Sequence, residues 1–461
     1  MSKVVHITDN HRYTDIVNCV NESLTQEDKE VILDDLSEIA DTAIEAMSFD
    51  DNPNLLVFPQ ILGEYGDDIG KGTILSLNGD QISTGNIMGF VGINDTQVDI
   101  KSRFSKNDPN DYFLHYMLQR VFSINLFDIK HDTADRRIFD FLLYLFPHFL
   151  KKALAQGLFK KYRKFEHNDA NVRGPIDINR HIRQNIPFRG TIAYTTREHS
   201  YDNELTQLIR HTIEFIKTKP LGSNVLTSDV ETRECVKQIT FATTSYSQRE
   251  RQKVINKNLR PVRHPYFSEY TALQKICLQI LRHESLKYGQ EKDKIYGILF
   301  DGAWLWEEYL FTILGPLGFK HPHNKSNEGG IRMFQNHSDD EAISINSRRL
   351  YPDFYKDDFI LDAKYKHLSK GVSREDLYQV VTYMYCKTAK NGGYVYPNNT
   401  AREQGITKYV LEGYGGVMHL IPFYVPQANK DSLPFKEFKE FCEDINQSET
   451  SLSESINPKG V

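Results

Sequence analysis

Residues 348–386 read RRLYPDFYKDDFILDAKYKHLSKGVSREDLYQVVTYMYC and predict two short strands followed by a helix in the C-terminal part of the chain. A first short strand is expected to begin at 351–354, and a second strand starts at residue 359 and leads into DAKYK. Polar residues at 356–358 supply a turn, so the two strands should pair as a hairpin. The residues that follow, 373–389, have the apolar spacing of a helix.

Two carboxylates and an ammonium converge in this predicted hairpin. Nine positions separate Asp353 from Asp362, a separation that a tight turn closes, and strand alternation places Asp362 and Lys364 on one face. Hydrolysis of a phosphodiester needs charge neutralisation and an activated water, and carboxylate-held Mg²⁺ supplies both. We therefore expect Asp353, Asp362 and the Ala363 carbonyl to bind Mg²⁺ or Mn²⁺. Lys364 would stabilise the negative transition state.

Two flanking helices offer further polar groups. In the helix after the hairpin, Asp376, Gln379 and Tyr383 should lie near one another, and we expect Gln379 to reach the scissile phosphate or the metal-bound water. In the expected upstream helix AWLWEEYLFTIL, Glu307 or Glu308 would add a catalytic carboxylate. Taken singly, each of these residues is an ordinary polar surface residue. Their order along the chain, with a helix on either side of the hairpin, favours a nuclease site.

The rest of the chain predicts a multidomain α+β fold. Residues 54–103 show strand alternation with turn signals, whereas 111–164 carry apolar residues at helical spacing. In the C-terminal part, apolar runs at 394–397 and 416–425 predict later strands of a mixed sheet flanked by helices. The predicted parts are an N-terminal mixed β/α partner-binding domain over 1–110, a mainly helical middle over 111–290, a C-terminal α/β nuclease domain over 291–445 and a disordered, Ser-rich tail over 446–461.

Two basic segments of the middle region are candidates for contact with DNA. Lys and Arg side chains bind phosphates and release counterions, although ordinary solvated helix surfaces have the same composition. The candidate DNA-binding residues are Arg173, Arg180, Arg183, Arg249, Arg251, Lys253, Lys257 and Arg260.

Bulk properties narrow the class of protein. The 461 residues have 39% hydrophobic and 26% charged side chains, which is typical of a globular protein with two or three domains. A net charge of -6 restricts any DNA contact to local basic surfaces. The five cysteines form no CxxC pair, which argues against zinc or a disulfide framework. Without a signal peptide or membrane segment in the sequence, we expect a cytoplasmic bacterial or archaeal protein.

Several segments together resemble the McrC family, the nuclease subunit of McrBC-type, modification-dependent restriction systems. The resemblance covers roughly residues 85–425 and is carried by VRGPIDINRHIRQN, YDNELTQLIRHTIEF, FDGAWLWEEYL, YPDF, LDAKYK and DLYQVVTYMY. It implies a restriction-endonuclease-like domain of the PD-(D/E)xK type that cuts double-stranded DNA in antiviral defence. Asp353, Asp362 and Lys364 match the catalytic positions, Gln379 matches the YQ helix and Glu307 an acidic helix residue.

The same resemblance implies a partner, an McrB-type AAA+ GTPase or ATPase that forms a hexameric ring and is stimulated by the N-terminal domain. The chain has no GxxxxGK[ST] phosphate loop of its own, so a separate motor is expected. The segment IKSRF departs from the family, in which a Pro-Lys pair often follows the strand. Cutting both strands would take two nuclease subunits, which a transient dimer would supply.

Two other functions stay open from the sequence. The chain would be a catalytically silent activator or adaptor of an AAA+ ring if the nuclease site were inactive, although the intact Asp, Asp and Lys set argues against this. Alternatively, it would be a stand-alone DNA repair nuclease, which leaves the long upstream region without a purpose. The DNA sequence or modification that is attacked is not encoded in any motif of the chain.

Overall fold

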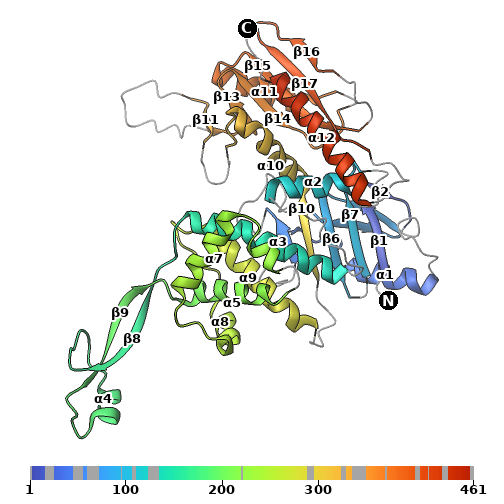
Figure 1. Cartoon of the computed structure of the whole chain (residues 1–461). Helices are drawn as coiled ribbons and strands as arrows, with labels where there is room; N and C mark the ends of the chain where they lie inside the picture. The colour runs from blue at the N-terminus through green and yellow to red at the C-terminus, as the bar shows by residue number, and fades with distance from the viewer. Residues whose placement is uncertain are drawn as a thin grey trace. The chain divides into compact units, whose positions relative to one another are not determined.

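The computed structural model describes residues 3–15, 25–44, 55–59, 72–94, 96–105, 111–122, 134–219, 222–287, 295–322, 329–334, 349–368, 371–399, 405–413, 415–427 and 434–456. The chain forms two compact units (Figure 1). The first combines Met1–Lys130 with Lys292–Val461, and the second is His131–Glu291. The predicted N-terminal and nuclease domains therefore lie in one unit, and the middle region is inserted between its two halves.

The N-terminal part of the first unit is built on a mixed sheet. Its strands, in spatial order, are β1 (Lys3–Thr8), β7 (Thr96–Lys101), β6 (Ile87–Ile93), β10 (Tyr296–Asp301) and β3 (Leu55–Phe58). β10 comes from far along the chain, yet it pairs antiparallel with β6 and parallel with β3. This corrects the predicted boundary at residue 291, because the first strand after the inserted unit completes the N-terminal sheet.

Smaller elements cover this sheet. Helix α1 (Gln26–Ser37) buries Ile32 and Leu36 in the same core as the strands, as apolar residues four apart on one helix face should. The short strands β2 (Arg12–Tyr13), β5 (Gln81–Thr84) and β4 (Leu75–Asn78) form a separate three-stranded sheet. The predicted mixed β/α character of the N-terminal part is confirmed.

The C-terminal part of the first unit is a second five-stranded sheet. Its spatial order is β13 (Phe354–Lys356), β14 (Phe359–Ala363), β15 (Asn391–Asn398), β17 (Val417–Tyr424) and β16 (Thr407–Val410). The central three strands are parallel, and the outer two are antiparallel to their neighbours. The chain crosses from β14 to β15 through helix α11 (Arg374–Lys387), whose Val380 and Met384 pack on Tyr394 of the sheet's core. The predicted helix and the two later strands are confirmed.

Helices α2 (Tyr112–Phe122), α10 (Gly302–Leu314) and α12 (Pro434–Ile456) pack together in the first unit. Glu449 of α12 accepts hydrogen bonds from the buried hydroxyl groups of Tyr309, at 2.7 Å, and Tyr116, at 3.0 Å. The prediction of a disordered tail over 446–461 is therefore wrong for 446–456, which form the last part of α12. Glu449 of this helix supplies the hydrogen-bond acceptor that the buried tyrosine hydroxyl groups need. Residues 457–461 lie outside the described part of the chain.

The second unit is mainly helical, as predicted, but it begins at His131 rather than at residue 111, since α2 belongs to the first unit. Its helices are α3 (Ala134–Ala155), α4 (Ile178–Asn185), α5 (Glu204–Lys217), α6 (Gly222–Leu226), α7 (Val230–Ala242), α8 (Arg251–Lys257) and α9 (Glu269–Lys287). A long antiparallel hairpin of β8 (Lys161–Asp169) and β9 (Ile192–Ser200) projects from these helices and carries α4 near its tip (Figure 1). Among the described residues, no helix is long and apolar enough to cross a membrane.

Candidate active site

The predicted hairpin is formed by β13 and β14, which pair antiparallel. Asp357 in the turn has a φ of 35°, in the left-handed region that Asp adopts more readily than most residues. The register brings Asp353, just before β13, beside the end of β14 that carries Asp362. There the Ala363 N–H donates to Asp353 Oδ2 at 2.7 Å. The expectation that the two carboxylates meet is confirmed.

Lys364 lies on the same side of the strand as Asp362, as the alternation predicted. Its Nζ is 2.7 Å from Asp362 Oδ2 and 3.1 Å from Asp376 Oδ1. The backbone N–H of Lys364 donates to the Val395 carbonyl at 2.9 Å, so the parallel ladder continues one residue past β14. Burial opposes the charged ammonium, but the carboxylates of Asp362, Asp353 and Asp376 raise its pKa above the ordinary value for lysine.

Asp376 also belongs to this cluster. The sequence predicted it only as a neighbour of Gln379. It lies in the first turn of α11 and also accepts from Lys366 Nζ at 2.8 Å. Burial acts to raise its pKa, but hydrogen bonds from Lys366 and Ser373 and the charge of Lys364 outweigh burial and lower the pKa to about 2. Asp376 therefore stays ionised and anchors the ammonium of Lys364.

Glu307 and Glu308 of α10 have different surroundings. Burial, and then the carboxylates of Asp353, Asp301 and Asp362, hold the pKa of Glu307 well above its usual range, which means that Glu307 lies among these acids. Glu308 instead has His321 Nε2 at 3.8 Å from its Oε1. The carboxyl of Glu307 is thus influenced by both predicted aspartates, and Glu308 lies beside it.

His321 is a neighbour of the site that no sequence motif indicated. Its Nδ1 donates to the Asp353 carbonyl at 2.6 Å, and its ring packs near those of Phe311 and Phe354. Burial acts to lower the pKa of His321, but Glu308 and the Asp353 carbonyl outweigh it and raise the pKa. A single histidine outside any recognisable spacing carries no signal in the sequence, so only the fold connects it with Asp353.

Gln379 of α11 is exposed, and its one hydrogen bond within the described residues goes from Nε2 to Tyr383 Oη at 2.9 Å. The expected proximity of Gln379 and Tyr383 is confirmed. No hydrogen bond joins Gln379 to the aspartates or Lys364 in the part of the chain that the structure describes, so its catalytic role stays a prediction.

The donor set suits a hard divalent cation. Asp362 is 2% exposed, and burial together with the Asp353 carboxylate raises its pKa. The carboxyls of Asp353, Asp362 and Glu307 thus form a group in which negative charge is only partly balanced by Lys364. Within the described residues, no three His, Cys, Asp or Glu side chains are arranged to hold a metal by themselves. A cation here would complete its shell with a backbone oxygen and water, as Mg²⁺ commonly does.

Among the predicted DNA-binding residues, Arg180 has contacts within the second unit. Arg180 pairs with Glu166 at 2.6 Å and donates to the carbonyls of His167 and Tyr194, so it ties α4 to the hairpin rather than facing solvent. The reason is that the two-stranded hairpin has little core of its own and is held by such bonds. Arg183, by contrast, is exposed, and its Nε donates to a carbonyl of its own helix.

Some residues of the second basic segment also make contacts within the second unit. The Arg251 guanidinium lies 5.2 Å from the centroid of the Phe215 ring. The ammonium groups of Lys253 and Lys257 are 2.9 Å from Glu250 and 3.6 Å from Glu204, respectively. Arg173, Arg249 and Arg260 are exposed. For these exposed residues, contact with DNA stays a prediction.

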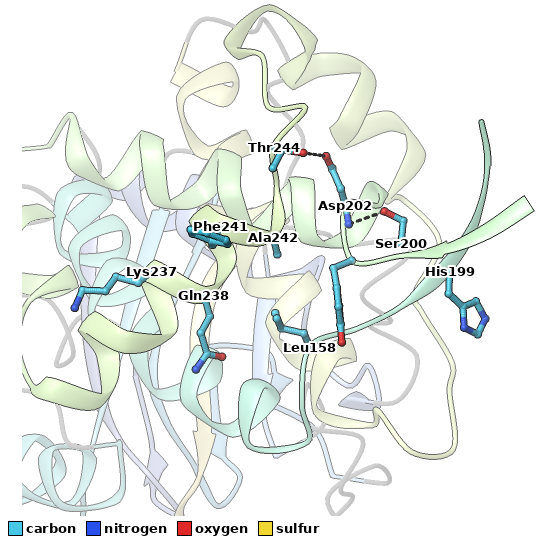
Figure 2. A pocket seen from close by; sticks show the side chains of 10 residues that line it. Leu158, His199, Ser200, Asp202, Lys237, Gln238, Phe241, Ala242 and Thr244 are labelled. Atoms are coloured by element: carbon cyan, nitrogen blue, oxygen red, sulfur yellow. Dashed lines mark hydrogen bonds between the residues drawn. The ribbon is translucent and has the colours of Figure 1, made fainter. Parts of the chain in front are cut away.

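A surface pocket of about 650 Å³ lies on the second unit, where β9 leaves the hairpin and α7 ends (Figure 2). None of the predicted catalytic or DNA-binding residues lines it. The lining residues are Leu158, His199, Ser200, Tyr201, Asp202, Lys237, Gln238, Phe241, Ala242 and Thr244.

Comparison with known proteins identifies the family. A model described as McrBC 5-methylcytosine restriction system component matches residues 82–397. The chain belongs to this family. The matched range of the McrBC family includes the hairpin, α10 and α11, and hence Glu307, Asp353, Asp362, Lys364 and Gln379.

Two solved structures of this family are similar to the chain. One is a half-complex of Thermococcus gammatolerans McrB AAA+ hexamers with bound McrC, with 15% identity, a TM-score of 0.43 and coverage of 96% of this chain and 99% of that chain. The other is the Thermococcus gammatolerans McrBC complex, with 13% identity, a TM-score of 0.33 and coverage of 68% and 87%. No curated protein matches the chain.

Proposed function

We propose that this chain is the Mg²⁺-dependent endonuclease subunit of an McrBC-type restriction complex and hydrolyses phosphodiester bonds of double-stranded DNA. The observation that carries the proposal is the convergence of Asp353, Asp362 and Lys364 at the end of β14, with Glu307 of α10 among the same acids. Neighbouring carboxylates repel one another and destabilise the fold, so a buried cluster of acids with shifted pKa values is a candidate functional site.

Asp353, Asp362 and the Ala363 carbonyl would hold the Mg²⁺ ion, with Mn²⁺ as a substitute. When bound, the ion supplies charge neutralisation at the phosphate and lowers the pKa of a water molecule. Burial, and then repulsion from Asp353, raises the pKa of Asp362 and of Glu307, so a divalent charge beside them would favour the ionised form of both carboxyls.

Lys364 performs the second task, which is stabilisation of the negative charge that develops on the phosphoryl oxygens. Its ammonium is held between Asp362 and Asp376, at 2.7 and 3.1 Å, and is therefore oriented before DNA binds. Gln379, on the exposed face of the same helix as Asp376, would contact the phosphate of the bound DNA.

The proposed partner is an McrB-type AAA+ GTPase or ATPase ring. The family match supports a role in a restriction system with more than one component, and the chain lacks a phosphate-loop motif with which to hydrolyse a nucleotide itself. Cleavage of both strands would bring two nuclease subunits together at the cut.

The test is cleavage of modified and unmodified plasmid DNA by this chain with its AAA+ partner, Mg²⁺ and GTP or ATP. Asp362→Asn and Lys364→Ala should each reduce cleavage by at least about a hundredfold, the loss expected when a metal ligand or a transition-state contact is removed. Matched controls are Asp357→Asn, which makes the same chemical change in the exposed turn of the hairpin, and Lys408→Ala on the exposed edge strand β16.

The outcomes separate three functions. Loss of cleavage in the site variants alone, with stimulation of the partner's nucleotide hydrolysis retained, supports the nuclease subunit. A wild-type chain that stimulates hydrolysis but never cuts would instead be an activator or adaptor. Mg²⁺-dependent cleavage that needs no partner would indicate a stand-alone nuclease.

A further inference from the structure

Tyr365, the residue directly after Lys364, is bound to the N-terminal sheet. Its side chain is 5% exposed, and its hydroxyl group is hydrogen-bonded to Ser102 Oγ at 2.7 Å and lies 3.1 Å from Met88 Sδ. Ser102 follows β7 directly and is 263 positions away from Tyr365 in the sequence. The strand end that carries Lys364 is therefore fastened to a part of the chain outside the nuclease sheet.

A buried ion pair supports the ring of Tyr365 from one side. The guanidinium of Arg103 lies 4.9 Å from the ring centroid, and its Nε donates to Asp9 Oδ2 at 2.8 Å. Asp9 is fully buried, and a second nitrogen of Arg103 donates to the side chain of Asn86. Phe104 meets the Tyr365 ring edge-on at 5.1 Å. These contacts leave the ring little room to move.

The first residue of α10 also packs against the ring of Tyr365. A Cβ atom at Gly302 would lie only 2.6 Å from Tyr365 Cε1, so glycine is what allows the ring to pack here. The Gly302 N–H donates to the Asn86 carbonyl at 2.9 Å, and Asn86 is also bound by Arg103. The start of the helix that carries Glu307 and the ring of Tyr365 are thus held by the same group of residues.

The backbone transmits this anchoring to Lys364. Side chains of successive residues in an extended chain point to opposite sides, and the Lys364 N–H is bound to the Val395 carbonyl. When the side chain of Tyr365 is fixed on one side, the side chain of Lys364 must therefore point to the other side, toward Asp362. We propose that Tyr365 is a positioning residue whose bond to Ser102 holds Lys364 in its place in the site. Its effect on catalysis rests on the proposed nuclease function.

The first test is hydrogen exchange of the full chain, which needs no enzymatic activity. In Tyr365→Phe, which removes only the hydroxyl group, amides in a peptide covering 360–368 should exchange about fivefold to tenfold faster, the effect of one buried hydrogen bond. Ser102→Ala should give at least this increase, since it also removes the bond that Ser102 Oγ accepts from the Phe104 N–H at 3.2 Å. The double variant should exchange no faster than Ser102→Ala, because the bond to Tyr365 is already lost there. The matched control is Tyr270→Phe, which deletes a fully buried hydroxyl bonded to the Gly157 carbonyl at 2.7 Å in the second unit. Unchanged exchange of 360–368 in Tyr365→Phe would overturn the proposal.

The second test is cleavage at saturating DNA and Mg²⁺. Tyr365→Phe should lower kcat about tenfold with little change in the affinity for DNA, because the ammonium stabilises the negative charge that develops in the transition state. Tyr270→Phe should leave kcat unchanged. Faster exchange with wild-type kcat would overturn the positioning role. If the wild-type chain does not cleave DNA, faster exchange still supports Tyr365 as the anchor of Lys364, and the proposed nuclease function is what fails.

Discussion

Replacement of Asp362 by asparagine should stabilise the metal-free protein while it abolishes cleavage. Asp362 is buried, and burial and the carboxylate of Asp353 raise its pKa from 3.8 to about 7. A carboxyl whose pKa is raised in the folded state stabilises the fold below pH 4, and this stabilisation is lost as the pH rises through 7. The pKa is raised by roughly three units, and each unit corresponds to about 1.4 kcal/mol, so the gain in the free energy of unfolding is at most about 4 kcal/mol.

The expected gain is smaller than this limit, since Asp362 interacts with the carboxylate of Asp353 and the free energy therefore does not belong to Asp362 alone. In EDTA at pH 8, Asp362→Asn should raise the free energy of unfolding by about 2 kcal/mol, and at pH 4 the gain should vanish. Urea unfolding at the two pH values measures both. Mg²⁺ should raise the Tm of the wild type and have little effect on the variant. A variant that is equally destabilised at both pH values would refute the reasoning.

Three further predictions concern residues away from the carboxylates. Burial and the charge of Arg251 lower the pKa of His211 to about 4, so the wild-type protein loses stability as the pH falls from 6.5 through 4. Between pH 7 and 4.5, the free energy of unfolding in urea should fall by about 2 kcal/mol less in His211→Phe than in the wild type. An equal fall in both proteins would contradict this prediction. Glu449→Ala should cost about 2 kcal/mol in thermal or urea unfolding, since Oε1 of Glu449 accepts from two buried tyrosines, whereas a solvated tail would show no change. Arg180→Ala should speed hydrogen exchange in the β8–β9 hairpin and Arg183→Ala should not, and similar exchange in both would count against the structural role of Arg180.

Residues close together in the chain were the ones that could be predicted. The β13–β14 hairpin, the meeting of Asp353 with Asp362 and the shared face of Asp362 and Lys364 follow from turn residues and strand alternation, which act over a few positions. Helices α10 and α11 likewise follow from their apolar spacing.

The errors came from composition and from long-range pairing. The last residues were assigned to a disordered tail because they are polar and Ser-rich, but Ile445, Leu452 and Ile456 lie on a buried face of α12. The domain boundary at residue 291 was misplaced because a strand's own residues do not say which sheet it joins. The charge of Arg180 is visible in the sequence, whereas its bonds to the carbonyls of His167 and Tyr194 are seen only in the folded chain.

The sequence by itself determined the local geometry of the candidate site and, through motifs in their order along the chain, the family. Only the folded chain shows that His321 lies beside Asp353, that β10 completes the N-terminal sheet, and that Tyr365 is anchored to Ser102. The physical reason is that hydrogen bonding and alternation along one strand depend on neighbouring residues, whereas contacts between segments hundreds of positions apart depend on how complete surfaces pack.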